Sequence, residues 1–225
     1  MNRHLSRILL FCSLLMLNSV LLAGTRVVQE LDLGNKPEIS DSKNSSGNSE
    51  QGSLNNNPKV ELLTNKGSIV IELFPDQAPI TVKNFLAYVQ SGFYNNTLFH
   101  RVIKNLLIQG GAYSNTLKMK ADRGYIKSEA NNGLSNTRGT IAAARRANDS
   151  ESASSQFFFN VVDNPQFDFS STNTMSSRGY AVFGKVIKGQ EIIDAMRLSP
   201  TIRIDAIGDN VPKSPMIISQ ARVLE

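Results

Sequence analysis

Few side chains in this 225-residue sequence are suited to nucleophilic or metal chemistry. It has one cysteine, Cys12, and two histidines, His4 and His100. No Gly-x-Ser-x-Gly turn occurs, which is the motif that exposes the nucleophile of many serine hydrolases. The cysteine and histidines do not cluster as zinc ligands, and the carboxylates lack calcium-loop spacing. We therefore expect neither a hydrolase nor a metal or cofactor site, and we interpret His100 as a structural hydrogen-bonding residue.

Another kind of chemistry is suggested by the segment that begins Phe99-His100-Arg101. It continues with Val102-Ile103, a short turn, two large apolar residues and Gln109-Gly110-Gly111. Arginine stays protonated at physiological pH and presents its N–H donors in a rigid plane. Arg101 could therefore stabilise charge that develops on a substrate without forming a covalent bond. An isolated arginine is more often a surface ion-pair residue, so a catalytic role for Arg101 depends on the residues around it.

That pattern closely resembles the catalytic segment of cyclophilins. Three further matches follow in the order that this family shows, at residues 139–142, 155–160 and 179–186, and together they cover residues 59 to 224. The resemblance is greatest to bacterial cyclophilins. It implies a mainly β fold, a closed eight-stranded antiparallel β-barrel capped by two α-helices. The implied activity is that of a peptidyl-prolyl cis-trans isomerase acting on proline-containing polypeptides.

The resemblance also implies roles for individual residues. Arg101 would be the catalytic residue. A peptide bond before proline faces a rotation barrier of about 18–20 kcal/mol from amide resonance, and an arginine could hydrogen-bond the carbonyl and the proline nitrogen as the bond turns. An apolar pocket for the proline ring would be formed by Leu106, Leu107, Phe158 and Phe167, with Tyr180 closing one side. The extended peptide would be bound by Gln109, Gln156 and the backbone near Ala144 and Arg145.

Three features depart from the family pattern. Leu106 replaces the usual phenylalanine after the turn, and Gln166 stands where human-type cyclophilins have tryptophan. The connection between Asp168 and Tyr180 is longer than usual. Because Leu106 departs from the pattern, the alternative to an isomerase is a binding or chaperone module that holds proline peptides without turnover. We favour the isomerase because Arg101 and the glutamines are kept.

The hydrophobic pattern independently predicts a β-rich domain with two helices. Residues 60–63 and 68–74 flank a polar, glycine-containing turn and should form a hairpin. Apolar residues recur at helical spacing over 80–90 and again over 191–198. Many short strands with only two helices favour a closed barrel or sandwich over alternating β-α units. Further strands are predicted at 98–103, 106–109, 140–144, 156–162, 180–186 and 216–224.

The N-terminal part has the layout of an exported protein. Residues 1–23 combine Arg3 and Arg7 with an apolar run too short for a membrane-spanning helix, as in a cleaved secretory signal. If it were retained, it would tether the domain to a membrane. Residues 24–58 are mostly polar and should form a disordered linker, leaving 59–225 as the isomerase domain. We expect a periplasmic protein, with a eukaryotic secretory route as the alternative.

Charge and composition set few other expectations. Loss of Arg3 and Arg7 with the signal would leave 22 of the 24 basic residues against 19 acidic ones, a small surplus typical of a solvated surface. Arginines and aromatic residues are not interleaved as in RNA-binding motifs, so we expect no nucleic-acid partner. One domain of this length can bury its own core, and a monomer is expected.

Overall fold

The computed structural model describes residues 57–225. The predicted signal, and all but the last two residues of the predicted linker, lie outside the described residues. Over the described part, no helix is both long enough and apolar enough to cross a membrane.

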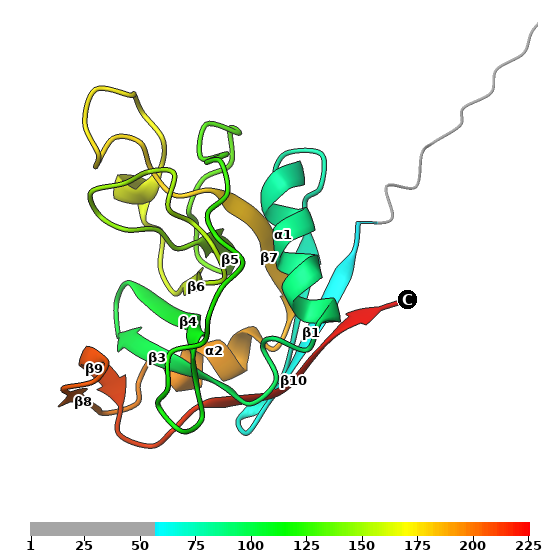
Figure 1. The fold of residues 1–225 in the computed structure, drawn as a ribbon, viewed down its shortest axis with the longest axis vertical. Helices are drawn as coiled ribbons and strands as arrows, with labels where there is room; N and C mark the ends of the chain where they lie inside the picture. Colours follow the sequence, from blue (N-terminus) through cyan, green and yellow to red (C-terminus); the bar gives the residue numbers. More distant parts are fainter. Residues whose placement is uncertain (1–56) are drawn as a thin grey trace, which may run out of the picture. The chain divides into compact units, whose positions relative to one another are not determined.

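Eight antiparallel strands close into a barrel, as the sequence predicts (Figure 1). Around the barrel the order is β1-β10-β3-β4-β6-β5-β7-β2. Because β1 pairs with both β2 and β10, the sheet has no open edge at its ends. The strands are β1 (Lys59–Thr64), β2 (Gly67–Leu73), β3 (Thr97–Ile103), β4 (Leu107–Ser114), β5 (Thr140–Ala143), β6 (Phe157–Asn160), β7 (Val182–Lys188) and β10 (Ile217–Leu224).

Two helices pack on this barrel, close to their predicted bounds. Helix α1 (Pro79–Gln90) buries Val82, Phe85 and Val89, which lie on one face at three-and-four spacing. It ends before Gly92, whose φ of 68° suits glycine. Helix α2 (Gln190–Met196) buries its apolar side in the same way. The aliphatic strand residues and these helix faces form the main core inside the barrel.

The differences from the sequence-based expectation have physical reasons. A second hairpin, β8 (Thr201–Ile204) and β9 (Gly208–Pro212), was not predicted, because most of β8 is exposed and carries no alternating burial signal. A single 3-10 turn, η1 (Pro165–Phe167), was also not predicted. Strand β4 continues past Gln109 through glycine and alanine, which have little strand propensity. Strand β6 is shorter than expected, and β7 begins two residues later.

Strand alternation divides the apolar residues of β4, β5 and β6 between two cores. Phe157 and Phe159 belong to the main core inside the barrel. Phe158, between them, belongs to a smaller cluster with Leu107 and Val182. Successive side chains of a strand point to opposite faces, so this second cluster lies on the outer face of the barrel wall. A run of three phenylalanines thereby supplies both a barrel core and a surface platform.

Candidate active site

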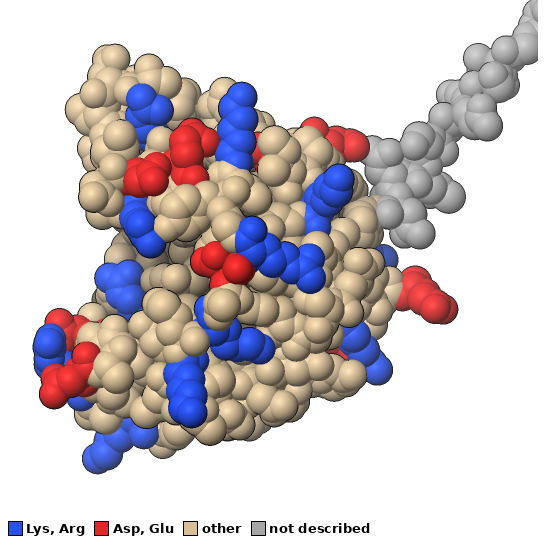
Figure 2. Space-filling model, viewed as in Figure 1, with Lys and Arg blue, Asp and Glu red and all other residues tan. Residues whose placement is uncertain are grey.

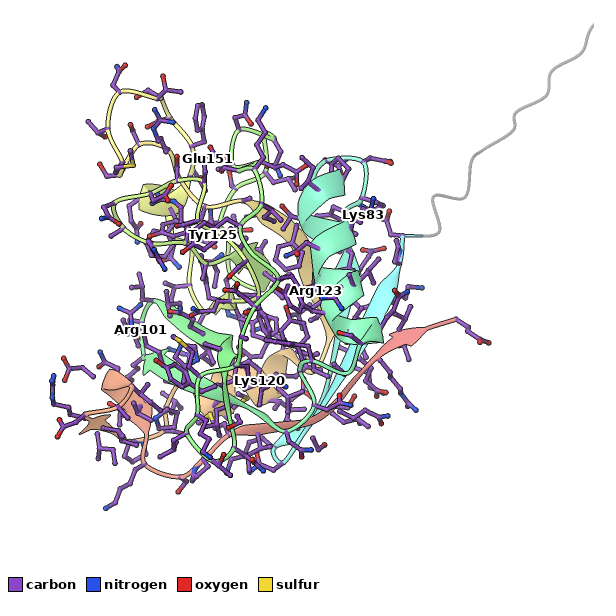
Figure 3. The ribbon with its side chains drawn as sticks, in the orientation of Figure 1. Lys83, Arg101, Lys120, Arg123, Tyr125 and Glu151 are labelled. Carbon is purple, nitrogen blue, oxygen red and sulfur yellow. The ribbon has the colours of Figure 1, made fainter. Side chains whose placement is uncertain are left out.

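A pocket of about 230 Å³ opens on this outer face. Figure 3 shows Arg101 at the side of the fold away from α1, and Figure 2 shows the surface hollowed on that side. All but one of the site residues expected from the sequence line this pocket. They are Arg101, Leu106, Leu107, Gln109, Ala144, Arg145, Phe158, Phe167 and Tyr180. The exception, Gln156, lines an adjoining, more polar pocket that also includes Gln109 and Ala144.

Hydrogen bonds join the polar residues on one side of the pocket into a chain. Arg101 on β3 is the register partner of Gln109 on β4. The Arg101 Nη1 atom donates to Gln109 Oε1 at 3.3 Å, and Gln109 Nε2 donates to Gln156 Oε1 at 2.9 Å. The paired strands therefore bring these side chains together, and the chain of amides orients the guanidinium at the pocket.

Three aromatic rings form the opposite, apolar side. Phe158 lies 5.7 Å from Phe167 and 5.5 Å from Tyr180 between ring centroids, and Phe167 lies 5.0 Å from Tyr180. All three contacts are edge-on, the arrangement that aromatic quadrupoles favour. The rings come from β6, from η1 and from the residues just before β7. This platform offers an apolar wall to a small ring.

The departures at Leu106 and Gln166 have different consequences. Leu106 lines the pocket and is partly buried, so that corner is aliphatic. Gln166 is exposed on η1, and its Nε2 donates to Asn164 Oδ1 at 3.1 Å. It is not among the residues that line the pocket. The two positions are therefore not equivalent: one shapes the pocket directly, and the other lies outside it.

Buried asparagines support this pocket, and sequence reasoning missed them. Asn136 Nδ2 donates to the carbonyls of Phe167 at 3.0 Å and Tyr180 at 3.3 Å. Asn164 Nδ2 donates to the Leu106 carbonyl at 2.9 Å, and Asn160 links the other two asparagines. All three side chains are 1% exposed or less. Only Asn160 stands beside buried apolar residues in the sequence, Phe159 and Val161, and that signal does not reveal its partners.

His100 is not among the residues lining the pocket. It is 6% exposed and packs against Tyr113 with 5.0 Å between ring centroids. The pKa of His100 is lowered to about 4, mainly by burial and in smaller part by the positive charge of Arg101, while a hydrogen bond to the Leu98 backbone opposes both. Its Nδ1 has no hydrogen-bond partner among the described residues. The ring is thus a neutral core group at neutral pH.

Comparisons with known proteins agree with this fold. The family model described as cyclophilin type peptidyl-prolyl cis-trans isomerase/CLD matches residues 59–223. A peptidyl-prolyl cis-trans isomerase of Acinetobacter baylyi is 50% identical over 74% of this chain and 86% of its own length. Peptidyl-prolyl cis-trans isomerase B of Escherichia coli is 49% identical over 74% of this chain and 99% of its own length.

Solved structures give the same result. A cyclophilin type peptidyl-prolyl cis-trans isomerase of Cryptosporidium parvum superposes with a TM-score of 0.60 at 29% identity, covering 75% of this chain and 98% of its own. The sequence and structural matches together show that the chain belongs to the cyclophilin family. It is a peptidyl-prolyl cis-trans isomerase, with bacterial relatives at 45–50% identity over most of the chain.

Proposed function

We propose that Arg101 carries the isomerisation and that the aromatic wall holds the proline ring of the substrate. The supporting observation is that a guanidinium and three aromatic rings face one pocket of about 230 Å³. A five-membered ring fits the apolar side, formed by Phe158, Phe167 and Tyr180. The amide before the proline then lies toward Arg101.

The reaction needs rotation about one bond and no bond cleavage. As the amide twists it loses resonance, and the proline nitrogen regains a lone pair that can accept a hydrogen bond. A donor oriented toward that nitrogen or toward the carbonyl binds the twisted form better than the planar one, and that difference lowers the barrier. The hydrogen bond from Arg101 to Gln109 keeps the guanidinium oriented before the substrate arrives.

Substitution of Arg101 tests this role. Arg101→Ala should lower kcat/KM for an Ala-Pro peptide by about 10²-fold, the usual effect of losing one preorganised donor. Arg101→Lys keeps the charge without the planar fork and should recover only part of the loss. Arg123→Ala is the matched control, because this arginine lies beside α1 and lines neither pocket (Figure 3). Wild-type turnover by folded Arg101→Ala would remove Arg101 from the mechanism.

We propose further that the protein is exported to the periplasm, where it assists the folding of exported polypeptides as a monomer. The support is the basic start and short apolar run of residues 1–23, followed by the polar stretch to Pro58. N-terminal sequencing of the protein from a periplasmic fraction should show a chain that begins near residue 24. Recovery of the uncleaved chain in the cytoplasm would contradict the export proposal and leave the isomerase activity unaffected.

A further inference from the structure

The resemblance gives Arg145 a role in substrate binding through its backbone alone, but the Arg145 side chain also makes several contacts. Its Nε donates to the Gly179 carbonyl at 2.9 Å, and its Nη2 donates to the Met175 carbonyl at 2.7 Å. Its Nη1 donates to the Arg146 carbonyl at 2.9 Å. The guanidinium carbon also lies 4.5 Å from the centre of the Tyr180 ring. Every nitrogen of the guanidinium is therefore bonded to backbone, and its face covers a residue of the aromatic wall.

The two carbonyls from Met175 and Gly179 belong to the long connection, residues 169–179. This loop is closed at its base, where the Tyr180 amide donates to the Phe167 carbonyl at 2.8 Å and Ser170 donates to Ser177 at 2.8 Å. Gly179 has a φ of 63°, and a Cβ there would lie 2.5 Å from the Phe169 nitrogen. The residues that close the loop, Phe167 and Tyr180, are also two of the three aromatic residues in the wall.

From these contacts we infer that Arg145 is a positioning residue that clamps the 169–179 loop to the proline pocket and holds the Tyr180 ring. The inference rests on the proposal that the pocket receives proline. Arginine suits the task because a planar fork can serve several carbonyls while its face stacks on an aromatic ring. A lysine at this position would keep the charge but lose the fork and most of the stacking.

The clamp should act on substrate binding more than on the chemical step. The Arg101–Gln109–Gln156 chain does not include Arg145, so the polar side of the pocket keeps its geometry when the clamp is lost. The aromatic wall and the loop beside it would loosen. Phe169 and Met175 of the loop line neither the proline pocket nor the adjoining polar pocket. Arg145 therefore acts on the proline pocket through the Tyr180 ring and through Gly179 beside it.

The experiment compares Arg145→Ala and Arg145→Lys with wild type in the full-length protein. For an Ala-Pro peptide, both variants should raise KM by about tenfold and change kcat less than twofold. Hydrogen exchange provides a readout that does not depend on activity. The Ser170 and Tyr180 amides should exchange faster in both variants, while amides of β1 and β2 should stay protected.

Arg123→Ala is the matched control, because the Arg123 guanidinium also lies over a tyrosine, 5.3 Å from the centre of the Tyr88 ring, but away from the pocket. It should leave KM and loop exchange at wild-type values. Full rescue by Arg145→Lys would overturn the clamp, since charge alone would then be enough. Unchanged loop exchange in Arg145→Ala would overturn it as well. Fast loop exchange with an unchanged KM would show that the loop does not support the proline pocket.

Discussion

At the scale of single residues, neighbours in sequence have different roles where the register of β3 against β4 shifts, between Phe99 and Arg101. Arg101 reaches the pocket on the outer face, whereas His100 beside it is buried against Tyr113. A positive charge and a buried imidazole at adjacent positions also affect each other. Part of the reason that His100 stays neutral is the charge of Arg101, although burial is the larger cause of its lowered pKa.

The depressed pKa of His100 makes a prediction about acid stability. The folded protein holds this pKa at about 4, against 6.5 in an unfolded chain. Between these values the unfolded chain binds a proton that the folded chain does not, so stability is present above pH 6.5 and is lost as the pH falls toward 4. The slope from this group is at most about 1.4 kcal/mol per pH unit.

Urea unfolding at pH 7, 6 and 5 checks this for wild type and His100→Gln. The variant should lose stability overall but show a shallower dependence on pH in this range. Carboxylates such as Glu61, whose pKa is lowered by hydrogen bonds from Ser68 and Arg222, contribute equally to both proteins and cancel in the comparison. Parallel pH profiles would show that His100 titrates normally in the folded state.

At the scale of elements, the pocket wall depends on joints between β5, β6, η1 and the start of β7. Backbone ladders join β5 to β6 and to β7, and the asparagine side chains add the links to η1 and to the residues just before β7. Asn136 is central, because its side chain serves the Phe167 and Tyr180 carbonyls and its backbone amide donates to Asp168. A small set of side-chain hydrogen bonds therefore holds two aromatic rings in place.

Asn136→Ala should destabilise the protein by about 1–3 kcal/mol, because it removes the side-chain donor to the Phe167 and Tyr180 carbonyls and one of the two acceptors of the Asn160 amide. Urea unfolding measures the free energy, and KM for a proline peptide should rise with it. Asn148→Ala is the matched control, since Asn148 is exposed in a loop, and it should have less than about 0.5 kcal/mol of effect. Equal stabilities for the two variants would show that the network is not a structural support.

At the scale of the whole molecule, the barrel closes between Lys59 and Leu224, which pair with each other across β1 and β10. The Pro58 carbonyl accepts a hydrogen bond from the Leu73 amide at 2.9 Å, so the last residue of the predicted linker contacts the barrel. The composition of residues 24–57 is too polar to supply an apolar face for this barrel.

Deletion of residues 24–57 should therefore change neither the melting temperature nor kcat/KM. The comparison is between the mature chain that begins at residue 24 and a chain that begins at Pro58, measured by thermal unfolding and by turnover of an Ala-Pro peptide. A drop of more than about 4 °C, which corresponds to roughly 1 kcal/mol or more for a domain of this size, would mean that the segment contributes packing.

The eight barrel strands, both helices and the residues of the pocket could be predicted from the sequence without coordinates. The aliphatic alternation of β2 and the helical spacing of α1 are local patterns, and local burial on one face follows directly from them. The resemblance carried by the segment that begins Phe99-His100-Arg101 and by the three later matches identified the pocket residues. Of these, only Gln156 lines the adjoining pocket alone. Those positions could be listed without coordinates because they repeat a family pattern.

The contacts that join Arg145, the 169–179 loop and the asparagines around that pocket could not be predicted from the sequence. Arg145 bonds to Gly179, 34 residues later in the chain, and Asn136 bonds to Tyr180, 44 residues later. Hydrogen bonds of this span depend on how β5, β6 and β7 pair in the closed barrel, and nothing in the local sequence around either partner encodes the other. The family resemblance therefore predicted that the backbone near Arg145 binds the substrate peptide. It could not predict the contacts of the Arg145 side chain, because these depend on the 169–179 loop that the fold brings against it.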